Sequence, residues 1–250
     1  GNAAAQHPQA GALRAVANWI GEQTGASVGY LTEAANSVGA QLVGALPGAG
    51  GLDAGRMLAE PLKAYLLLHT EPVLDAADPA AAADALRGAG MVVALTSFRD
   101  AAADVADVML PIAPFTETSG TFVNAEGRVQ GFHGVVKPLG ETRPAWKVLR
   151  VLGNLLGLPG FAQESSEEVR AEALGDVAAL PARLSNRSDA AVEFAAAPAG
   201  LERLADVRIY ATDALVRRAA SLQMTADAVL PFVGISSAVW ERLALRPAQR

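Results

Sequence analysis

The sequence predicts an α/β fold, in which helices cover both faces of a parallel sheet in a Rossmann-like arrangement. Continuous apolar runs at 64–68 and 91–95 are interpreted as buried strands, because they lack the polar alternation of a strand with one solvated face. A third strand is predicted at 105–110, where Asp107 is the one charged residue and Pro111 ends the run. An alanine-rich helix is predicted at 79–86 and a short helix at 100–103, between these runs. Buried strands that alternate with helices are typical of parallel sheets.

Two helices and a loop are predicted before the first strand. Apolar residues recur at helical spacing over 13–20, and a second helix is predicted over 32–42. Between them, a short strand is predicted at 27–30. The glycine-dense stretch 47–55 is predicted to be a loop.

A hairpin and a helix are predicted after the third strand. Asn124–Gly127 lies between the short segments at 121–123 and 128–130, which is typical of a hairpin loop that contains glycine. A helix with one apolar face should begin after Pro144, which suits a first helical turn, and end near Gly157.

The chain is predicted to divide into three parts. Residues 1–160 form the α/β region, and the charged, alanine-rich segment 161–204 is a linker with one helix. Residues 205–250 begin a further unit that is truncated, because the chain stops without a terminal element and so resembles a piece of a longer protein. This last unit is expected to contain a strand at 207–210 and helices at 213–224 and 236–243.

Composition excludes several classes of protein. The net charge of −6 and the lack of a lysine–arginine stripe argue against nucleic acid as a partner. No apolar run reaches the roughly 18 residues of a membrane-spanning helix, so direct membrane insertion is not expected. The 250 residues include no cysteine, which excludes thiolate zinc sites and iron–sulfur ligation by this chain. His7, His69 and His133 form no metal-ligand spacing.

The glycine-rich loop is a candidate phosphate-binding site, since backbone N–H groups beside a helix start can hold an anion. Its spacing fails both usual forms. The pattern Gly48-x-Gly50-x-x-Asp53 lacks the third glycine of a dinucleotide motif, and Gly55 is followed by Arg56 rather than by lysine. An ordinary loop is the simpler interpretation.

Two histidines are candidate catalytic bases. A serine nucleophile needs a base within reach, but the sequence has no Gly-x-Ser-x-Gly elbow and nothing in it pairs His69 or His133 with a serine. His69 follows a predicted strand, and ligands of parallel sheets bind beyond the carboxyl ends of strands. A solvated loop histidine is the simpler interpretation of this residue.

The polar residues of 117–130 form the main candidate site. A polar group that is buried without a hydrogen bond costs roughly 1–3 kcal/mol, so such a density of polar groups needs fixed partners. From spacing alone, Glu117 is predicted to pair with Arg128 across the hairpin, while Asn124 and Gly127 form its turn.

Three motifs in this order resemble the molybdopterin oxidoreductase superfamily. They are Ala-Asp-Val-x-Leu-Pro at 106–111, Glu-x-x-Gly-Thr-x-x-Asn-x-Glu-Gly-Arg-x-Gln at 117–130 and Pro-x-Gly-Glu-x-Arg-Pro-x-Trp at 138–146. Within that superfamily, the chain is most similar to the large iron–sulfur subunit of respiratory NADH:quinone oxidoreductase (complex I), in its bacterial form. The likeness covers about 25–160 well and 205–245 more loosely.

This resemblance implies a role in electron transport from NADH to quinone. The implied location is the hydrophilic arm of complex I, at the cytoplasmic side of the bacterial inner membrane, with other subunits of the arm as partners. Iron–sulfur clusters are expected in an N-terminal part of the parent chain, and no cofactor is expected in this segment. Relatives in the superfamily bind a molybdenum cofactor that the complex I branch generally lacks, and this chain has no cysteine to ligate the metal.

The polar set is therefore expected to be the remnant of a cofactor domain, and the isolated chain to be inactive. Glu117 would accept a hydrogen bond from the backbone or from Arg128, while Thr121 and Asn124 close the turns. Two alternatives stay open: a piece of a working molybdenum oxidoreductase, such as a formate-dehydrogenase-like enzyme, or a module that serves assembly alone. The vestigial residues are Glu117, Gly120, Thr121, Asn124, Glu126, Gly127 and Arg128.

Overall fold

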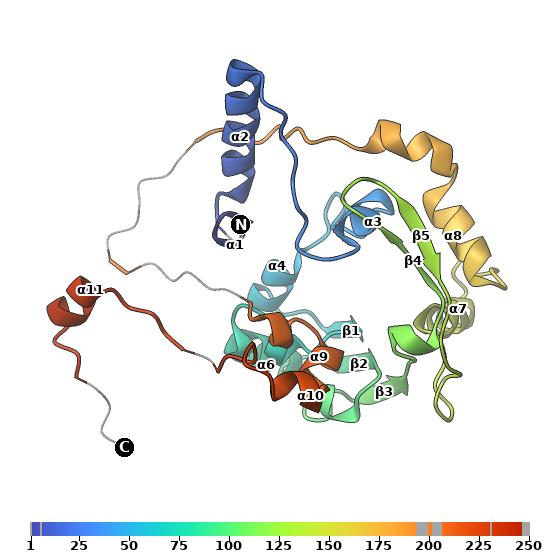
Figure 1. The fold of residues 1–250 in the computed structure, drawn as a ribbon. Helices are drawn as coiled ribbons and strands as arrows, with labels where there is room; N and C mark the ends of the chain where they lie inside the picture. Colours follow the sequence, from blue (N-terminus) through green and yellow to red (C-terminus); the bar gives the residue numbers. More distant parts are fainter. Residues whose placement is uncertain (1, 6, 194–199, 202–206, 231, 247–250) are drawn as a thin grey trace. The chain divides into compact units, whose positions relative to one another are not determined.

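The chain forms two compact units, residues 1–206 and 207–250 (Figure 1). The structure, a computed structural model, describes residues 2–5, 7–193, 200–201, 207–230 and 232–246. Each unit is described by itself.

The first unit contains a three-stranded parallel sheet. Its strands are β1 (Ala64–Leu68), β2 (Met91–Thr96) and β3 (Val108–Pro111), in the order β1-β2-β3. The third strand begins later than the predicted 105–110, because the N–H groups of Val105 and Ala106 both donate to the carbonyl of Ala102 in a turn.

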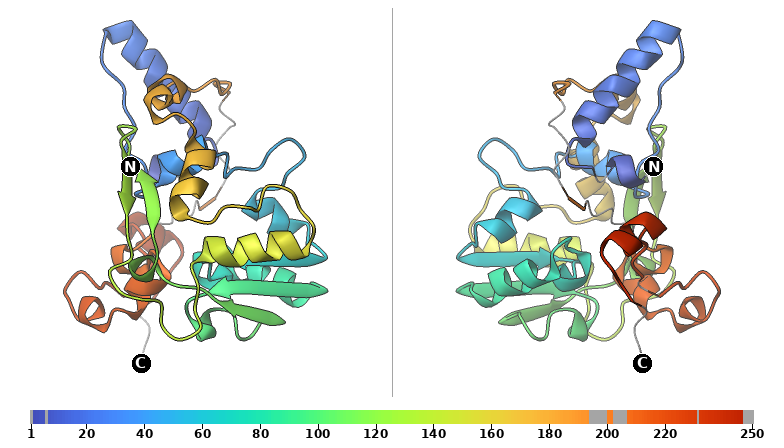
Figure 2. Two further views of the ribbon diagram at one scale, coloured as in Figure 1. Left: turned by 90° about the vertical axis from the view of Figure 1, so that its right-hand side faces the viewer. Right: turned by 90° about the vertical axis from the view of Figure 1, so that its left-hand side faces the viewer.

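Helices cover both sides of this sheet. Figure 2 shows α6 (Pro79–Arg87) and α7 (Ala145–Leu155) on opposite sides of it. On the α6 side, Leu86 packs with Tyr65 and Val92 in a buried cluster that α4 (Ala54–Ala59) also contacts. The predicted α/β class with a parallel sheet is confirmed.

Capping side chains set the starts of these helices. Asp78 accepts from the N–H groups of Ala80 and Ala81 at the start of α6, as N-cap aspartates do. Asp53 accepts from the N–H of Arg56 at 2.8 Å and so starts α4. The predicted loop 47–55 is therefore wrong in its last two residues.

A β-hairpin follows the sheet, as the sequence predicts. Strands β4 (Gly120–Val123) and β5 (Val129–Phe132) pair antiparallel, with Val123 opposite Val129. Before the hairpin, Ile112 bridges to Arg143, whose carbonyl accepts from Ala113 N–H at 2.9 Å. The motif at 138–146 is thereby fixed beside the end of β3.

A second buried cluster joins the hairpin to the segment that the sequence predicts to be a linker. Val123 of β4 packs with Leu42, Leu174 and Leu180, and all four side chains are buried. Leu174 ends α8 (Ser166–Leu174), and Leu180 lies in the 3-10 helix η3 (Val177–Arg183). The described part of 161–204 thus contains the one predicted helix, a second helical turn, and two leucines of the core.

The N-terminal part contains α1 (Asn2–Ala5), α2 (Ala10–Thr24) and α3 (Ser37–Leu42). Helix α2 ends at Gly25, whose φ of 72° is left-handed. The strand predicted at 27–30 is wrong, since Val28 and Tyr30 make their contacts with side chains and backbone of other segments instead of a sheet. The remaining short helices are α5 (Pro72–Asp75), η1 (Arg99–Ala101) and η2 (Phe115–Glu117).

In its described residues, the second unit contains short helices joined by irregular segments and no strand. The strand predicted at 207–210 is wrong, because Ile209–Ala211 forms the 3-10 turn η4. The helix predicted at 213–224 is interrupted at Ala219, whose ψ of 87° is not helical. The helices are α9 (Ala214–Arg218), α10 (Ala220–Gln223) and α11 (Ser237–Arg242).

The second unit should promote weak self-association of the chain. Leu230, Phe232 and Val233 are 80%, 78% and 85% exposed, while Val229 and Trp240 are 48% and 38% exposed. Contiguous exposed apolar side chains favour association, because burial removes them from water. Light scattering over a concentration series should show a mass above that of one chain, and replacing Leu230 and Phe232 with serine should lower it. A strictly monomeric mass at high concentration would contradict this expectation.

Candidate functional site

The turn of the hairpin is built from the polar motif. Asn124 Oδ1 accepts from the N–H of Glu126 at 3.0 Å and from the N–H of Arg128 at 2.9 Å. Gly127 donates its N–H to the carbonyl of Asn124 and has a φ of 81°, which glycine adopts without strain. Asn124 and Gly127 therefore form the turn, as predicted from their spacing.

The predicted ion pair between Glu117 and Arg128 is wrong. Arg128 Nη2 lies 3.8 Å from Glu126 Oε2 at the exposed tip of the hairpin. Glu117 Oε2 instead accepts from the N–H of Leu139 at 2.9 Å. Glu117 lies in η2, and the close approach of Gly134 to its backbone brings the 134–139 segment within reach.

Thr121 does not close the turn, contrary to expectation. It lies within β4, where it pairs with Gly131. Gly120 pairs with Phe132, and a Cβ at Gly120 would lie 2.4 Å from that phenyl ring. Phe132 also meets Phe122 edge to face, with ring centroids 5.2 Å apart. The absence of a side chain at Gly120 thus leaves room for the Phe132 ring, which packs against Phe122.

Asn36 is a residue of the site that was not among the candidate site residues predicted from the sequence. Its Oδ1 accepts from the N–H of Val123 at 2.8 Å, which connects segments 87 positions apart. Gly39 allows this contact, because a Cβ there would lie 2.1 Å from Asn36 Oδ1. The Asn-x-x-Gly spacing could have indicated that Gly39 leaves room for the Asn36 side chain. It does not indicate that Asn36 bonds to Val123 of β4.

The carboxyl end of the parallel sheet is a second place where polar side chains gather. His69 follows β1 with a φ of 52° and donates its backbone N–H to the carbonyl of Leu95. Glu71, two residues further on, is buried at 3% exposure. At the end of β2, Ser97 Oγ donates to the carbonyl of Ile112 at 2.9 Å, while Thr96 Oγ1 bonds within its own turn.

The surroundings of His69 affect its protonation. His69 keeps solvent-exposed surface, yet the protein atoms around its ring remove enough water to lower its pKa below the ordinary value of 6.5. The charged imidazolium is thus less favourable in the folded chain than in the unfolded chain.

Stability should therefore fall as the pH drops through and below 6.5, because the unfolded chain then binds this proton more readily. The His69→Asn variant, which tolerates the same left-handed backbone, should lose less stability over that range. Urea midpoints measured from about pH 7.5 to about pH 5 would test this. Parallel pH curves for the two proteins would show that His69 makes no such contribution.

His133 does have a serine nearby, which the sequence did not reveal. Ser119 Oγ lies 3.4 Å from His133 Nδ1, at the outer limit of a hydrogen bond. Glu167 also lies near His133. The pKa of Glu167 is lowered mainly by a backbone hydrogen bond and by a hydrogen bond with Ser166, and only to a smaller extent by His133. The contact joins the residue just before β4 to the residue just after β5, and its length and exposure do not favour nucleophilic chemistry.

The side chains of the described residues do not assemble a metal centre. Thiolate ligation of a metal by this chain is excluded, because the sequence contains no cysteine. The hydroxyls of Thr96 and Ser97 at the sheet end already bond to backbone groups. Over the residues that the structure describes, no group of three histidine, cysteine or acidic side chains could hold a metal ion.

The family model of molybdopterin oxidoreductases matches residues 2–155, which is more than half of the chain. The chain belongs to the molybdopterin oxidoreductase family. The resemblance that the motifs indicate is thereby confirmed at the level of the family, and its narrower assignment to the complex I branch is not.

Individual relatives match over short stretches. A formate-dehydrogenase-like protein of Staphylococcus aureus (strain bovine RF122 / ET3-1) is 43% identical over 65 residues, which are 26% of this chain and 7% of that protein. The oxidoreductase YjgC of Bacillus subtilis (strain 168) is 40% identical over 76 residues, 30% of this chain and 8% of the relative. The alignments thus span less than a tenth of the length of these relatives. In the described part of the chain, no helix has the length and apolar character needed to cross a membrane.

Proposed function

We propose that this chain is a structural region of the large subunit of an NADH:quinone oxidoreductase, derived from a molybdopterin domain that no longer holds its cofactor. The observation that carries this proposal is that side chains of the polar motif bond to the backbone of the chain itself. Glu117 and Asn124 both accept hydrogen bonds from backbone N–H groups of the chain itself, so these side chains stabilise the fold.

Two further features support the proposal. The sequence offers no thiolate for molybdenum, and the best-placed hydroxyls at the sheet end are bonded to backbone groups. The motif order from 106 to 146 resembles the complex I branch of the family. In this function the partners are the other subunits of the hydrophilic arm, at the cytoplasmic side of the bacterial inner membrane, and the iron–sulfur clusters are ligated elsewhere in the parent chain.

A formate-dehydrogenase-like enzyme is the second candidate function. The names of the matched relatives favour it, since several of them are described as formate dehydrogenases. In that case the catalytic metal ligand and the other residues of the active site would belong to parts of the protein outside this chain. A role in assembly alone is compatible with the first proposal. The two differ in whether deleting the segment impairs assembly of the complex or electron transfer.

One experiment separates these functions. The parent gene is tagged at its chromosomal position, membranes are solubilised mildly, and complexes are resolved on a native gel. Our proposal predicts that the tagged chain comigrates with NADH-dependent reduction of an artificial electron acceptor. Comigration with formate-dependent dye reduction, and not with NADH-dependent reduction, would overturn it in favour of the second candidate.

Deletion of the segment encoding 1–160 distinguishes assembly from electron transfer. If the segment is structural, the large complex should be lost from the native gel together with its activity. Persistence of the assembled complex with only electron transfer impaired would contradict a structural role.

A further inference from the structure

Helix α2 is attached to the first unit without entering its hydrophobic core. Among the described residues, neither of the two buried clusters includes a side chain of α2. The buried positions of the helix are Ala12 and Gly21, which contribute little apolar surface. Trp19 and Ile20 are exposed at 59% and 49%. The attachment of this 15-residue helix therefore depends on other contacts.

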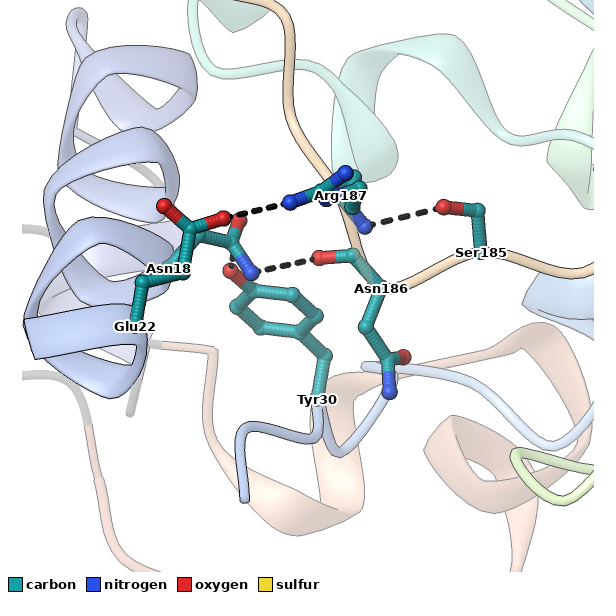
Figure 3. Close-up of polar contacts among 6 residues, drawn as sticks. All are labelled: Asn18, Glu22, Tyr30, Ser185, Asn186 and Arg187. Atoms are coloured by element: carbon teal, nitrogen blue, oxygen red, sulfur yellow. Dashed lines mark hydrogen bonds and ion pairs between the residues drawn. The ribbon is translucent and has the colours of Figure 1, made fainter. Parts of the chain in front are cut away.

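Those contacts come from residues 185–193, which we call the strap. Asn18 Nδ2 donates to the carbonyl of Asn186 at 2.9 Å, and Arg187 Nη2 meets Glu22 Oε1 at 2.5 Å (Figure 3). The Asn186 side chain in turn donates to the carbonyl of Val28 at 2.9 Å, in the segment just after α2. Two consecutive strap residues thus contact both the helix and its exit.

Tyr30 orients the helix side of this contact. Its Oη lies 3.0 Å from Asn18 Oδ1 and 3.0 Å from the carbonyl of Arg14. With its oxygen engaged by the tyrosine hydroxyl, the Asn18 amide directs its NH₂ group toward the strap (Figure 3). On the strap side, Ser185 Oγ accepts from the N–H of Arg187 and holds the turn.

The strap continues along the start of the helix. Ser188 Oγ donates to the carbonyl of Gly11 at 3.2 Å, and Gln9 Nε2 donates to the carbonyl of Glu193 at 3.1 Å. A Cβ at Gly11 would lie 3.1 Å from Ala190 Cβ, so the strap passes close to the helix there. The strap thus covers the Gly11–Ala12 side of α2.

Each of these contacts is weak by itself. The Arg187 and Glu22 side chains are 75% and 53% exposed, and exposed ion pairs contribute little because water and salt screen them. Exposed hydrogen bonds exchange readily with water. Segments held by few buried apolar contacts open at a lower free energy than the whole domain.

We propose that residues 185–193 act as a salt-sensitive latch, which holds α2 as a reversibly attached arm. The helix and the strap open together while the parallel sheet stays folded. Opening uncovers the Gly11–Ala12 side of α2, and raised ionic strength favours it through the Glu22–Arg187 pair. This inference concerns the fold alone and does not depend on the proposed function.

Hydrogen exchange of the full 250-residue chain, followed by mass spectrometry, tests the latch. Peptides covering α2 and the strap should exchange at matched rates, well ahead of β1 and β2. The Arg187→Ala variant should speed exchange in α2 by about two- to fivefold at low salt. Because screening already weakens the pair, this difference should largely vanish in about 0.5 M NaCl. The triple variant Asn186→Ala, Arg187→Ala, Ser188→Ala should speed exchange by roughly tenfold or more.

The Arg128→Ala variant is the matched control. It removes an ion pair of similar exposure at the hairpin tip and should leave exchange in α2 unchanged. The proposal is overturned if α2 exchanges as slowly as the sheet, or if the triple variant accelerates exchange in the strap without accelerating it in α2.

Discussion

Replacing Leu180 with alanine should lower the free energy of unfolding of the first unit by about 2–5 kcal/mol. The Leu180 side chain is 1% exposed and packs in the cluster with Leu42, Val123 and Leu174. The loss combines the transfer of the removed methyl groups with the cavity left behind. Urea denaturation followed by circular dichroism would measure it.

Leu156 provides the matched control, because it is 64% exposed at the end of α7. The Leu156→Ala variant should change the stability by less than about 0.5 kcal/mol. If Leu180→Ala were equally mild, the 161–193 segment would be the linker expected from the sequence and not a part of the core.

Replacing Gly127 with alanine should cost about 2–4 kcal/mol, for two separable reasons. Its φ of 81° is unfavourable for a residue with a side chain. In addition, a Cβ at this position would lie 2.2 Å from Leu184 Cδ1, so the residue after η3 would have to move. The hairpin turn and the packing of the 161–193 segment would both be disturbed.

Gly140 separates the two contributions. It has a φ of 57°, and a Cβ added there would meet no atom within 4 Å. The Gly140→Ala variant should therefore show the backbone cost alone, about 1 kcal/mol. Adding Leu184→Ala to Gly127→Ala should recover part of the larger loss. Equal losses for Gly127→Ala and Gly140→Ala, with no coupling to Leu184, would show that the close packing is absent.

Local patterns predicted the sheet and the hairpin well. The runs 64–68 and 91–95 are both strands, as their continuous apolar patterns indicate. The expected burial holds for most of β2 but not for β1, where Leu66 and Leu68 are 51% and 40% exposed. The strand predicted at 207–210 failed because the same local pattern found no partner strand. Strand propensity describes how well a residue fits a sheet, and it does not supply the neighbour.

The contacts that the sequence did not reveal are mostly between distant segments. The burial of Leu174 and Leu180 could not be predicted from the alanine-rich and charged composition of 161–204. It depends on packing against the hairpin residue Val123, far earlier in the chain. Glu117 bonds to Leu139 and not to Arg128, because η2 directs it toward the loop after the hairpin. Asn36 reaches Val123 across 87 positions. Spacing reports neighbours along the chain, whereas these partners are set by the tertiary fold.

The central claim is that the polar motif now supports the fold and holds no cofactor. The most direct measurement is the molybdenum, tungsten and pterin content of the chain purified from cells that make the cofactor. We predict metal and pterin contents far below one per chain, in protein that is folded by circular dichroism. A tightly held pterin, or molybdenum or tungsten near one per chain, would contradict the account.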